Sequence, residues 1–304
     1  MSHNPLNRIK NKKYRRQISG DQALMGWLFI LPSVVLFIIF VAIPAVSALY
    51  LSFTDYDILT STDWIGLKNY KMLLKDTIFH LTLKNIIYYV SFYVPLMIVL
   101  SLGCALALNK SFRAVSLFRT IFYIPALTSA IAAATVWLWI LNPHYGLLNQ
   151  LLSFIGVSGP AWLSKSGTAM ISIVMVTLWQ GMGGNMIIYL AGLQGISPEL
   201  YEAAIIDGAN KWKSFIFITV PMLKTTTFLV IVLSMIGSFQ LFDQAFALTQ
   251  GGPGYATMTP VYLIYDEGFN LLNMGYASSM AVVLFLIIML FTMLSFRLNR
   301  EEKG

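Results

Sequence analysis

Six long apolar segments constrain this chain more than any other feature of its sequence. A transmembrane helix needs about 20 consecutive, mostly apolar residues, and six stretches of this 304-residue chain meet that length. They lie at about residues 24–53, 86–108, 117–141, 168–193, 218–242 and 277–296. None of them alternates apolar and polar residues as the strands of a membrane barrel do. The sequence therefore predicts an all-α polytopic protein with six transmembrane helices.

The composition agrees with a membrane protein. Hydrophobic residues make up 57% of the chain and charged residues 11%, whereas a soluble domain carries about 25% charged residues. Most soluble enzymes and any disordered protein are thereby excluded. A single cysteine, Cys104, excludes a disulfide within the chain.

The positions of the basic residues predict the orientation of the helices. Most lie in the N-terminal arm, in the loops after the second and fourth segments, and in the C-terminal tail. The alternate loops hold the remaining five, Lys68, Lys71, Lys75, Lys84 and Lys165. Cytoplasmic loops carry the excess of Lys and Arg, so both termini are expected to be cytoplasmic. Lipid or nucleic-acid binding by the arm is the less favoured alternative. The chain divides into a basic N-terminal arm at 1–23, a six-span domain at 24–296 and a tail at 297–304.

Several kinds of membrane chemistry are missing from the sequence. No Asp, Glu, Lys or Arg lies well inside any of the six segments, which argues against a proton-coupled carrier and a voltage sensor. His3, His80 and His144 fall in three separate polar segments and predict no metal site. The chain has no G-x-x-x-x-G-K-[ST] phosphate loop, and the glycine-rich run at 251–254 is typical of a turn.

The loop at 197–217, between the fourth and fifth segments, carries helix signals. Ser197 and Pro198 predict a helix start, with the serine hydroxyl as the cap and the proline in the first turn. Asp207 and Gly208 predict its end, and Asn210 can cap a second helix. The residues alone leave open whether this helical loop is a docking surface or a plain connector.

The same loop resembles the EAA motif of ABC importer permeases. The matching residues are Glu202, Ala203, Ala204, Asp207, Gly208, Ala209, Phe215, Ile218, Pro221 and Leu223. Lys224 departs from the pattern, since many members have a proline there, and this change can alter the entry angle of the fifth helix. The stretches at 51–56, 64–70 and 248–253 resemble sugar permeases of the maltose, multiple-sugar and glycerol-phosphate type, in particular the first, maltose-type partner.

This resemblance implies a type I ABC importer permease fold in the plasma (inner) membrane of a prokaryote. It implies a heterodimer with a second permease subunit, two ATP-binding subunits that hold ATP and Mg, an extracytoplasmic solute-binding protein, and a sugar as the solute, expected to be an oligosaccharide. The chain itself would be no enzyme and would bind no cofactor. The loop would form a coupling helix that contacts the ATPase through Glu202, Ala203, Ala204, Asp207 and Gly208.

The resemblance also implies that the fourth and fifth spans line the solute pathway. The residues at those positions are Thr177, Gln180, Gly181, Gly184, Asn185, Ser234, Gly237, Ser238 and Leu241. Close helix packing is the favoured alternative for Gly181, Gly183 and Gly184. Trp179 could stack on a sugar or pack at the membrane interface.

Three other functions are alternatives to this one. An ABC permease for a non-sugar solute would share the EAA motif, although the sugar-type flanking stretches count against it. A stand-alone secondary carrier would need coupling charges in the spans. A membrane-embedded enzyme would need a nucleophile, a metal cluster or paired carboxylates at membrane depth, and the sequence offers none.

Overall fold

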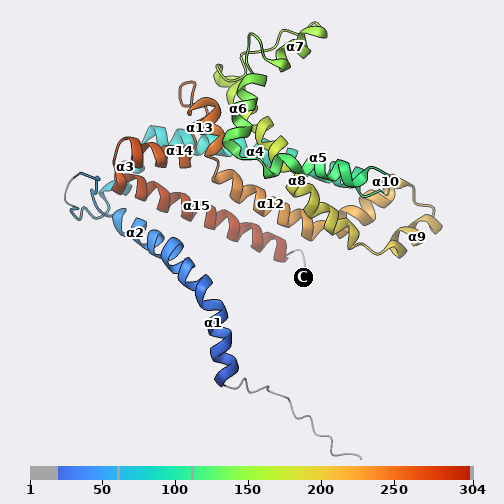
Figure 1. Ribbon diagram of the computed structural model, residues 1–304, viewed down its shortest axis with the longest axis horizontal. Coiled ribbons are helices and arrows are strands. Elements are labelled where there is room, and N and C mark those ends of the chain that lie inside the picture. Colours follow the sequence, from blue (N-terminus) through green and yellow to red (C-terminus); the bar gives the residue numbers. More distant parts are fainter. Residues whose placement is uncertain (1–19, 60–61, 111–112, 302–304) are drawn as a thin grey trace, which may run out of the picture. The chain divides into compact units, whose positions relative to one another are not determined.

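The computed structural model describes residues 20–59, 62–110 and 113–301, and this part of the chain is mostly helical (Figure 1). Within it there is no strand, and Thr54 and Trp64 form an isolated bridge. The basic residues of the predicted N-terminal arm before residue 20 lie outside the described residues. The chain divides into two units, with the boundary in the sequence between Tyr50 and Leu51.

The first unit is one long apolar helical run. It consists of α1 (Gly20–Phe37), the π-helical segment η1 (Ile38–Ala42) and α2 (Ile43–Leu51). The membrane-length part is Met25–Leu51, with a mean hydropathy of 2.8 and no buried residue. Proline lacks an N–H donor and clashes with the preceding turn, so the widened turn just before Pro44 accommodates it within a continuous helix.

The second unit contains three continuous helices of membrane length. They are α4 (Thr77–Leu108), α8 (Ser166–Gln194) and α15 (Met274–Glu301). The start of α4 is nine residues earlier than the predicted span, because Asp76 caps it by accepting from the N–H groups of Ile78 and Phe79 at 2.8 and 3.1 Å. Its other carboxylate oxygen accepts a 2.7 Å bond from the Tyr276 hydroxyl, which holds α15 against the start of α4.

Two further apolar segments are sharply bent. The predicted third span consists of α5 (Val115–Leu127) and α6 (Ala130–Ile140), at 101° to each other. The predicted fifth span at 218–242 overlaps a bent pair that starts earlier: α10 (Lys211–Ser214), η2 (Phe215–Thr219) and α11 (Val220–Met222), followed at 63° by α12 (Lys224–Phe239). The described residues therefore hold four helices of membrane length, or up to six spans if each bent pair crosses once.

Short helices cover both ends of the second unit. The α13 end carries α3 (Lys68–Leu73), α13 (Asp243–Thr249), α14 (Pro260–Tyr265) and η3 (Asp266–Asn270), and α9 (Pro198–Ile206) and α10 lie at the opposite, α9 end (Figure 1). The remaining short helix, α7 (Leu147–Phe154), follows α6. The predicted turn at 251–254 is confirmed, with positive φ angles at Gly251 and Gly254.

Two apolar clusters hold the second unit together. One includes Ile86, Met97, Ile173 and Met280 and joins α4, α8 and α15. The other lies nearer the α9 end and includes Met186, Tyr189, Leu193 and Leu223. Burial of large apolar side chains stabilises a fold by about 1.5–3 kcal/mol each in water. A cavity lies between these clusters, midway along α4 and α8.

Candidate functional site

A cavity of about 360 Å³ lies where α4, α5, α8, α12 and α13 converge. This volume is within the range of about 300–1,000 Å³ typical of small-molecule sites. Gly181 follows the first residue of the 29-residue helix α8 by 15 positions, which places the cavity about 22 Å along that helix and near its middle. The lining residues are Tyr89, Tyr93, Ala126, Thr177, Gln180, Gly181, Gly237, Gln240, Leu241, Phe242, Asp243 and Gln244.

One face of α8 forms part of the cavity wall. Thr177, Gln180 and Gly181 are spaced three and four residues apart, so a helix brings them to the same side. Gly181 keeps the cavity open: a Cβ atom there would lie 2.9 Å from both the Tyr93 hydroxyl and the Met97 methyl group. Three of the five pathway residues predicted on this helix therefore line the cavity, and their role in a solute pathway stays a prediction.

A buried pair of hydroxyl groups links α4 to α8 beside the cavity. The Tyr89 hydroxyl donates to Thr177 Oγ1 at 2.9 Å, and Thr177 donates in turn to the Ile173 carbonyl at 2.8 Å. The ring of Tyr89 stacks on that of Tyr93 with a centroid distance of 5.0 Å. Such a satisfied network fixes the orientation of both hydroxyl groups, and Tyr93, which is less buried than Tyr89, presents the more accessible ring of the pair.

Amide groups connect the cavity wall to the break between α5 and α6. Gln244 Nε2 on α13 donates to Gln180 Oε1 at 2.9 Å, and Gln180 Nε2 donates to the Thr128 carbonyl at 3.1 Å. Thr128 lies between the two halves of the bent pair. One glutamine therefore couples three elements that surround the cavity.

The lining carries a single formal charge. Asp243 is exposed and begins α13, and among the residues that the structure describes no Lys, Arg or His lines the cavity. The remaining polar groups are hydroxyls and side-chain amides. The cavity can thus donate and accept hydrogen bonds without offering a cation to its ligand.

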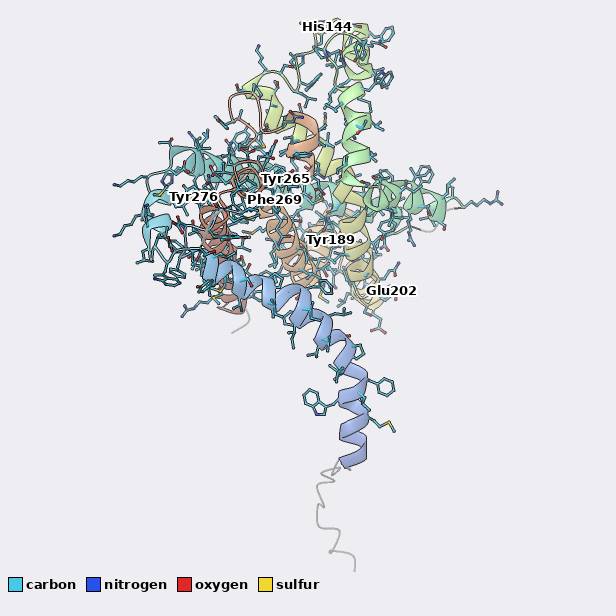
Figure 2. All side chains as sticks on the ribbon, turned by 60° about the vertical axis from the view of Figure 1, so that its left-hand side comes forward. His144, Tyr189, Glu202, Tyr265, Phe269 and Tyr276 are labelled. Atoms are coloured by element: carbon cyan, nitrogen blue, oxygen red, sulfur yellow. The ribbon has the colours of Figure 1, made fainter. Side chains whose placement is uncertain are left out.

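Aromatic rings back the wall of the cavity at Phe242. This ring packs on Phe246, Tyr262 and Tyr265 at centroid distances of 5.2–5.7 Å, and Tyr265 stacks on the exposed Phe269 at 5.4 Å. Figure 2 places Tyr265 and Phe269 together, well away from Glu202 at the α9 end. Burial raises the pKa of Tyr262, and the nearby Asp266 carboxylate adds to the shift, so its hydroxyl stays neutral.

The other predicted pathway residues lie outside this lining. Asn185 donates to the Gly181 carbonyl at 3.2 Å, within its own helix, and Ser238 donates to the Ser234 carbonyl at 2.6 Å. Ser234 Oγ is buried without a hydrogen-bond partner among the described residues. Gly184 faces open space.

Gly183 and Trp179 serve packing in this structure. A Cβ atom on Gly183 would overlap the Phe122 carbonyl oxygen and lie 2.7 Å from its carbon, so glycine permits the close contact of α8 with α5. Trp179 packs edge-on against Trp137 of α6 at a centroid distance of 5.6 Å and is absent from the cavity lining.

Sequence reasoning missed several lining residues. Tyr89 and Tyr93 are four residues apart in the second predicted span, and two hydroxyls at helical spacing in an apolar segment were the signal available. Phe242, Asp243 and Gln244 directly follow the polar end of the fifth span. No local pattern connects Ala126 to the cavity.

The residues of the predicted coupling loop form a short exposed helix. Glu202, Ala203 and Ala204 lie on α9, which contains no buried residue. The predicted stop is confirmed: Asp207 ends the helix, and Gly208 adopts a left-handed φ of +75°, which favours glycine. Glu202 is therefore accessible at the α9 end of the bundle (Figure 2).

Two capping predictions for this loop have different outcomes. The Asn210 side chain accepts from the Lys213 N–H at 2.8 Å, which confirms the second cap. The Ser197 hydroxyl makes no capping bond, so that prediction is wrong, although Pro198 does begin the helix. The Tyr201 hydroxyl instead anchors α9 by a 2.9 Å hydrogen bond to Thr219 Oγ1 of η2.

Large apolar side chains are exposed around α9. Ile205 and Ile206 are 68% and 85% exposed, and Trp212 and Phe217 are 67% and 74% exposed. Apolar side chains grouped on a surface in this way mark a contact with another protein or with a membrane.

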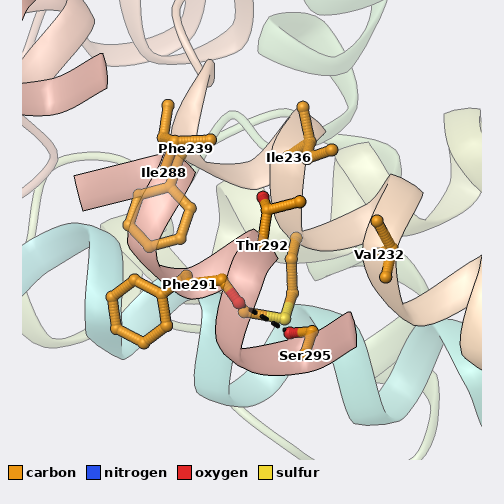
Figure 3. A pocket seen from close by; sticks show the side chains of 8 residues that line it. Val232, Ile236, Phe239, Ile288, Phe291, Thr292 and Ser295 are labelled. Atoms are coloured by element: carbon orange, nitrogen blue, oxygen red, sulfur yellow. Dashed lines mark hydrogen bonds between the residues drawn. The ribbon is translucent and has the colours of Figure 1, made fainter. Parts of the chain in front are cut away.

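Two other openings differ from the first cavity in size or in position. The cleft between α12 and α15 is lined mainly by apolar groups such as Ile236, Phe239 and Phe291 and has a volume of about 10 Å³ (Figure 3), room for about one water molecule. A cavity of about 430 Å³ lies between α13 and the segments after α6, with Asn142, Ser164 and Gln250 in its wall. None of its described lining residues belongs to α8. No group of three potential metal ligands occurs in the described part of the chain.

Known proteins share both the sequence and the fold. The family described as "binding-protein-dependent transport system inner membrane component" matches residues 97–301. The arabinooligosaccharides transport system permease AraP of Bacillus subtilis is 34% identical over 292 residues, covering 95% of this chain and 93% of AraP. The lactose transport system permease LacF of Rhizobium radiobacter is 34% identical over 285 residues, covering 91% and 95%.

A solved structure supports the same architecture. A chain of a bacterial ABC transporter involved in the import of the acidic polysaccharide alginate superposes with a TM-score of 0.80 at 22% identity, covering 94% of this chain and 98% of that chain. The expected permease fold is thereby confirmed in its general form. This chain belongs to the family of binding-protein-dependent transport system inner membrane components and is a permease of an ABC transporter.

Proposed function

We propose that this chain forms half of the pathway of a sugar importer, carrying an oligosaccharide across the plasma membrane of a prokaryote. The observation that carries this proposal is the cavity at mid-length of α4 and α8, with its hydroxyls, amides and aromatic rings. Sugar hydroxyls both donate and accept hydrogen bonds, and the apolar faces of sugar rings pack on aromatic side chains. The names of AraP and LacF, which refer to arabinooligosaccharides and lactose, support the same class of solute.

The proposed topology has six spans, with each bent pair crossing once and both termini in the cytoplasm. In this topology residues 1–23 form a basic cytoplasmic arm, residues 24–296 the six-span domain and residues 297–304 a cytoplasmic tail. Three of the four regions rich in basic residues flank membrane-length helices at the side where α9 lies, which favours a cytoplasmic α9 end. The α13 end then faces the extracytoplasmic side, where a solute-binding protein delivers the sugar.

Energy enters this arrangement through α9. The helix is connected directly to α8 on one side and through α10, η2 and α11 to α12 on the other, and both α8 and α12 line the cavity. A partner that moves α9 therefore moves two cavity walls. The partner we propose is one of two ATP-binding subunits, which hold ATP and Mg, while this chain binds no cofactor and catalyses no reaction.

The exposed surface of α9 fits such a contact. The small side chains of Ala203 and Ala204 allow close approach, and Ile205 and Ile206 supply apolar area that water would otherwise cover. The closing of the ATP-binding subunits then shifts the permease between two states with different access to the cavity. A second permease subunit completes the pathway as a heterodimer.

Uptake by reconstituted vesicles tests this function. Proteoliposomes that hold both permeases and the ATP-binding subunits, with the solute-binding protein outside and ATP inside, are offered labelled arabinotriose, lactose and maltotriose. We expect uptake of at least one sugar, and none when the ATP-binding subunits are omitted.

A matched pair of variants connects that uptake to the cavity. Gln180→Leu removes an amide from the lining and should raise the KM for the sugar, because hydroxyl partners are lost. Gln150→Leu removes an exposed amide on α7 and serves as the control. Uptake of none of the three sugars, or equal kinetics for both variants, would contradict the proposal.

A further inference from the structure

We propose that this pathway selects neutral oligosaccharides against those that carry a carboxylate or a phosphate, and that Asp243 determines this selectivity. The inference rests on the proposed sugar function and narrows its class of substrate. Asp243 is the single charged residue in the cavity lining, where it lies beside Gln244 and Gln240. An anionic group in the cavity would face this carboxylate without a basic side chain from the same lining.

The segment that contains Asp243 brings no basic residue of its own to this end of the unit. Residues 243–276 form α13, α14, η3 and the start of α15 and include three acidic residues but no Lys or Arg. The two other acids are held by neutral amides: Asn270 Nδ2 donates to Asp266 Oδ1 at 2.7 Å, and Asn273 Nδ2 donates to Glu267 Oε2 at 3.0 Å. These bonds orient the carboxylates and leave their negative charge in place.

The position of the charge makes it effective. A cleft whose walls carry one sign of charge focuses the field into its opening, and the exposed Asp243 supplies such a charge to this lining. An anionic sugar entering here would lose part of its hydration and meet a like charge, and both effects disfavour it. A neutral sugar meets neither obstacle, because the amides and hydroxyls of the lining can replace its hydrogen bonds to water.

The related alginate importer indicates why the lining should decide this property. That transporter is involved in the import of an acidic polysaccharide, and its chain shares the fold of this one at a TM-score of 0.80. A common fold therefore does not determine whether the preferred solute is neutral or charged. In this chain the charged group that a solute would meet is Asp243.

Competition between matched sugars tests the selectivity. Direct binding is measured on the purified complex of permeases and ATP-binding subunits without the solute-binding protein, so that only the membrane site selects. The probes are arabinotriose, lactose and maltotriose, together with the derivative of the best-bound sugar whose primary alcohol is oxidised to a carboxylate. We expect the neutral sugar to bind at least about tenfold tighter than its carboxylate derivative at low salt, and the ratio to shrink at high salt because ions screen the repulsion.

Two variants assign the effect to one residue. Asp243→Asn keeps the shape of the side chain and removes its charge, so the ratio should fall by about tenfold. Asp63→Asn removes an exposed carboxylate that is not part of the cavity lining and should leave the ratio as in the unmodified complex.

Each outcome separates the two proposals. Equal binding of neutral and carboxylate sugars by the unmodified complex, or an unchanged ratio in Asp243→Asn, would overturn the selectivity while leaving a sugar site in place. If none of the neutral sugars binds and none is taken up by the vesicles, the sugar function itself is overturned, and the selectivity with it.

Discussion

Replacing Gly183 by alanine should loosen the contact between α8 and α5, whereas the same change at Gly184 should not. A Cβ atom at Gly183 would overlap the Phe122 carbonyl oxygen and lie 2.8 Å from the Tyr123 Cα atom. Both obstacles are backbone atoms, so rotation of a side chain cannot relieve them. At Gly184, the next residue of the same helix, a Cβ atom would meet nothing within 4 Å.

The magnitude follows from two opposing effects. Alanine favours a helix over glycine by about 1 kcal/mol, and this gain applies to both positions. Overpacking costs about 1–3 kcal/mol, and contact with backbone places Gly183→Ala near the upper limit. We therefore expect a net loss of about 2 kcal/mol for Gly183→Ala and a gain of up to about 1 kcal/mol for Gly184→Ala.

Thermal unfolding of the purified transporter complex, followed by tryptophan fluorescence, measures this difference. The melting temperature should fall for Gly183→Ala and should stay constant or rise for Gly184→Ala. Because α5 also brings Ala126 to the cavity, uptake should decrease in the first variant alone. Equal melting temperatures for the two variants would refute the close packing of α8 on α5.

Three further predictions concern hydrogen bonds. Tyr89→Phe removes a buried 2.9 Å bond between α4 and α8 and should destabilise the complex by about 1 kcal/mol, seen as a lower melting temperature. A double-mutant cycle with Gln180→Leu and Gln244→Leu should give a coupling energy of about 0.5–1.5 kcal/mol, and additive effects would show that their 2.9 Å bond contributes nothing. Asp76→Asn keeps a cap for α4 but loses an acceptor for the Tyr276 hydroxyl, so its melting temperature should lie between those of the unmodified complex and Asp76→Ala.

Hydropathy locates the apolar segments of this chain but not their direction. The segment at 117–141 is mostly apolar, yet α5 and α6 meet at 101° across Thr128 and Ser129. The free energy of transferring a segment into a membrane depends on its composition. A bend that is stabilised by tertiary packing therefore hardly changes the hydropathy of that segment. Pro125 was a local sign of the break, but its presence alone does not distinguish a kink from a sharp turn.

The start of α4 shows a second limit. Residues 77–85 contain polar groups, so they fall below the threshold of an apolar segment. In the structure Phe79 and Thr82 are buried against other parts of the protein, and the Asp76 cap starts the helix there. A search for apolar segments of membrane length therefore misses the first turns of α4, which contain polar residues and pack on other parts of the protein.

The candidate site was partly accessible to sequence reasoning. Thr177, Gln180 and Gly181 share a helical face, and the structure brings them to one cavity. Their partners Tyr89 and Gln244 are distant in sequence, and one sequence alone does not reveal which helices meet. The EAA loop was easier, because its caps, turn and spacing are local, and only the role of the Ser197 hydroxyl was wrong.

The central claim is that the driving force reaches this chain at α9, and a pair of glycine variants tests it most directly. Gly208 and Gly156 have φ angles of +75° and +76°, and a Cβ atom at either would meet nothing within 4 Å. Gly208→Asp and Gly156→Asp therefore introduce the same charge and the same backbone strain, at the end of α9 in one case and after α7 in the other. The measurement is the amount of ATP-binding subunit that copurifies with each variant, together with ATP-driven sugar uptake. We predict that Gly208→Asp loses both and Gly156→Asp keeps both; unchanged association and uptake in Gly208→Asp would contradict the account.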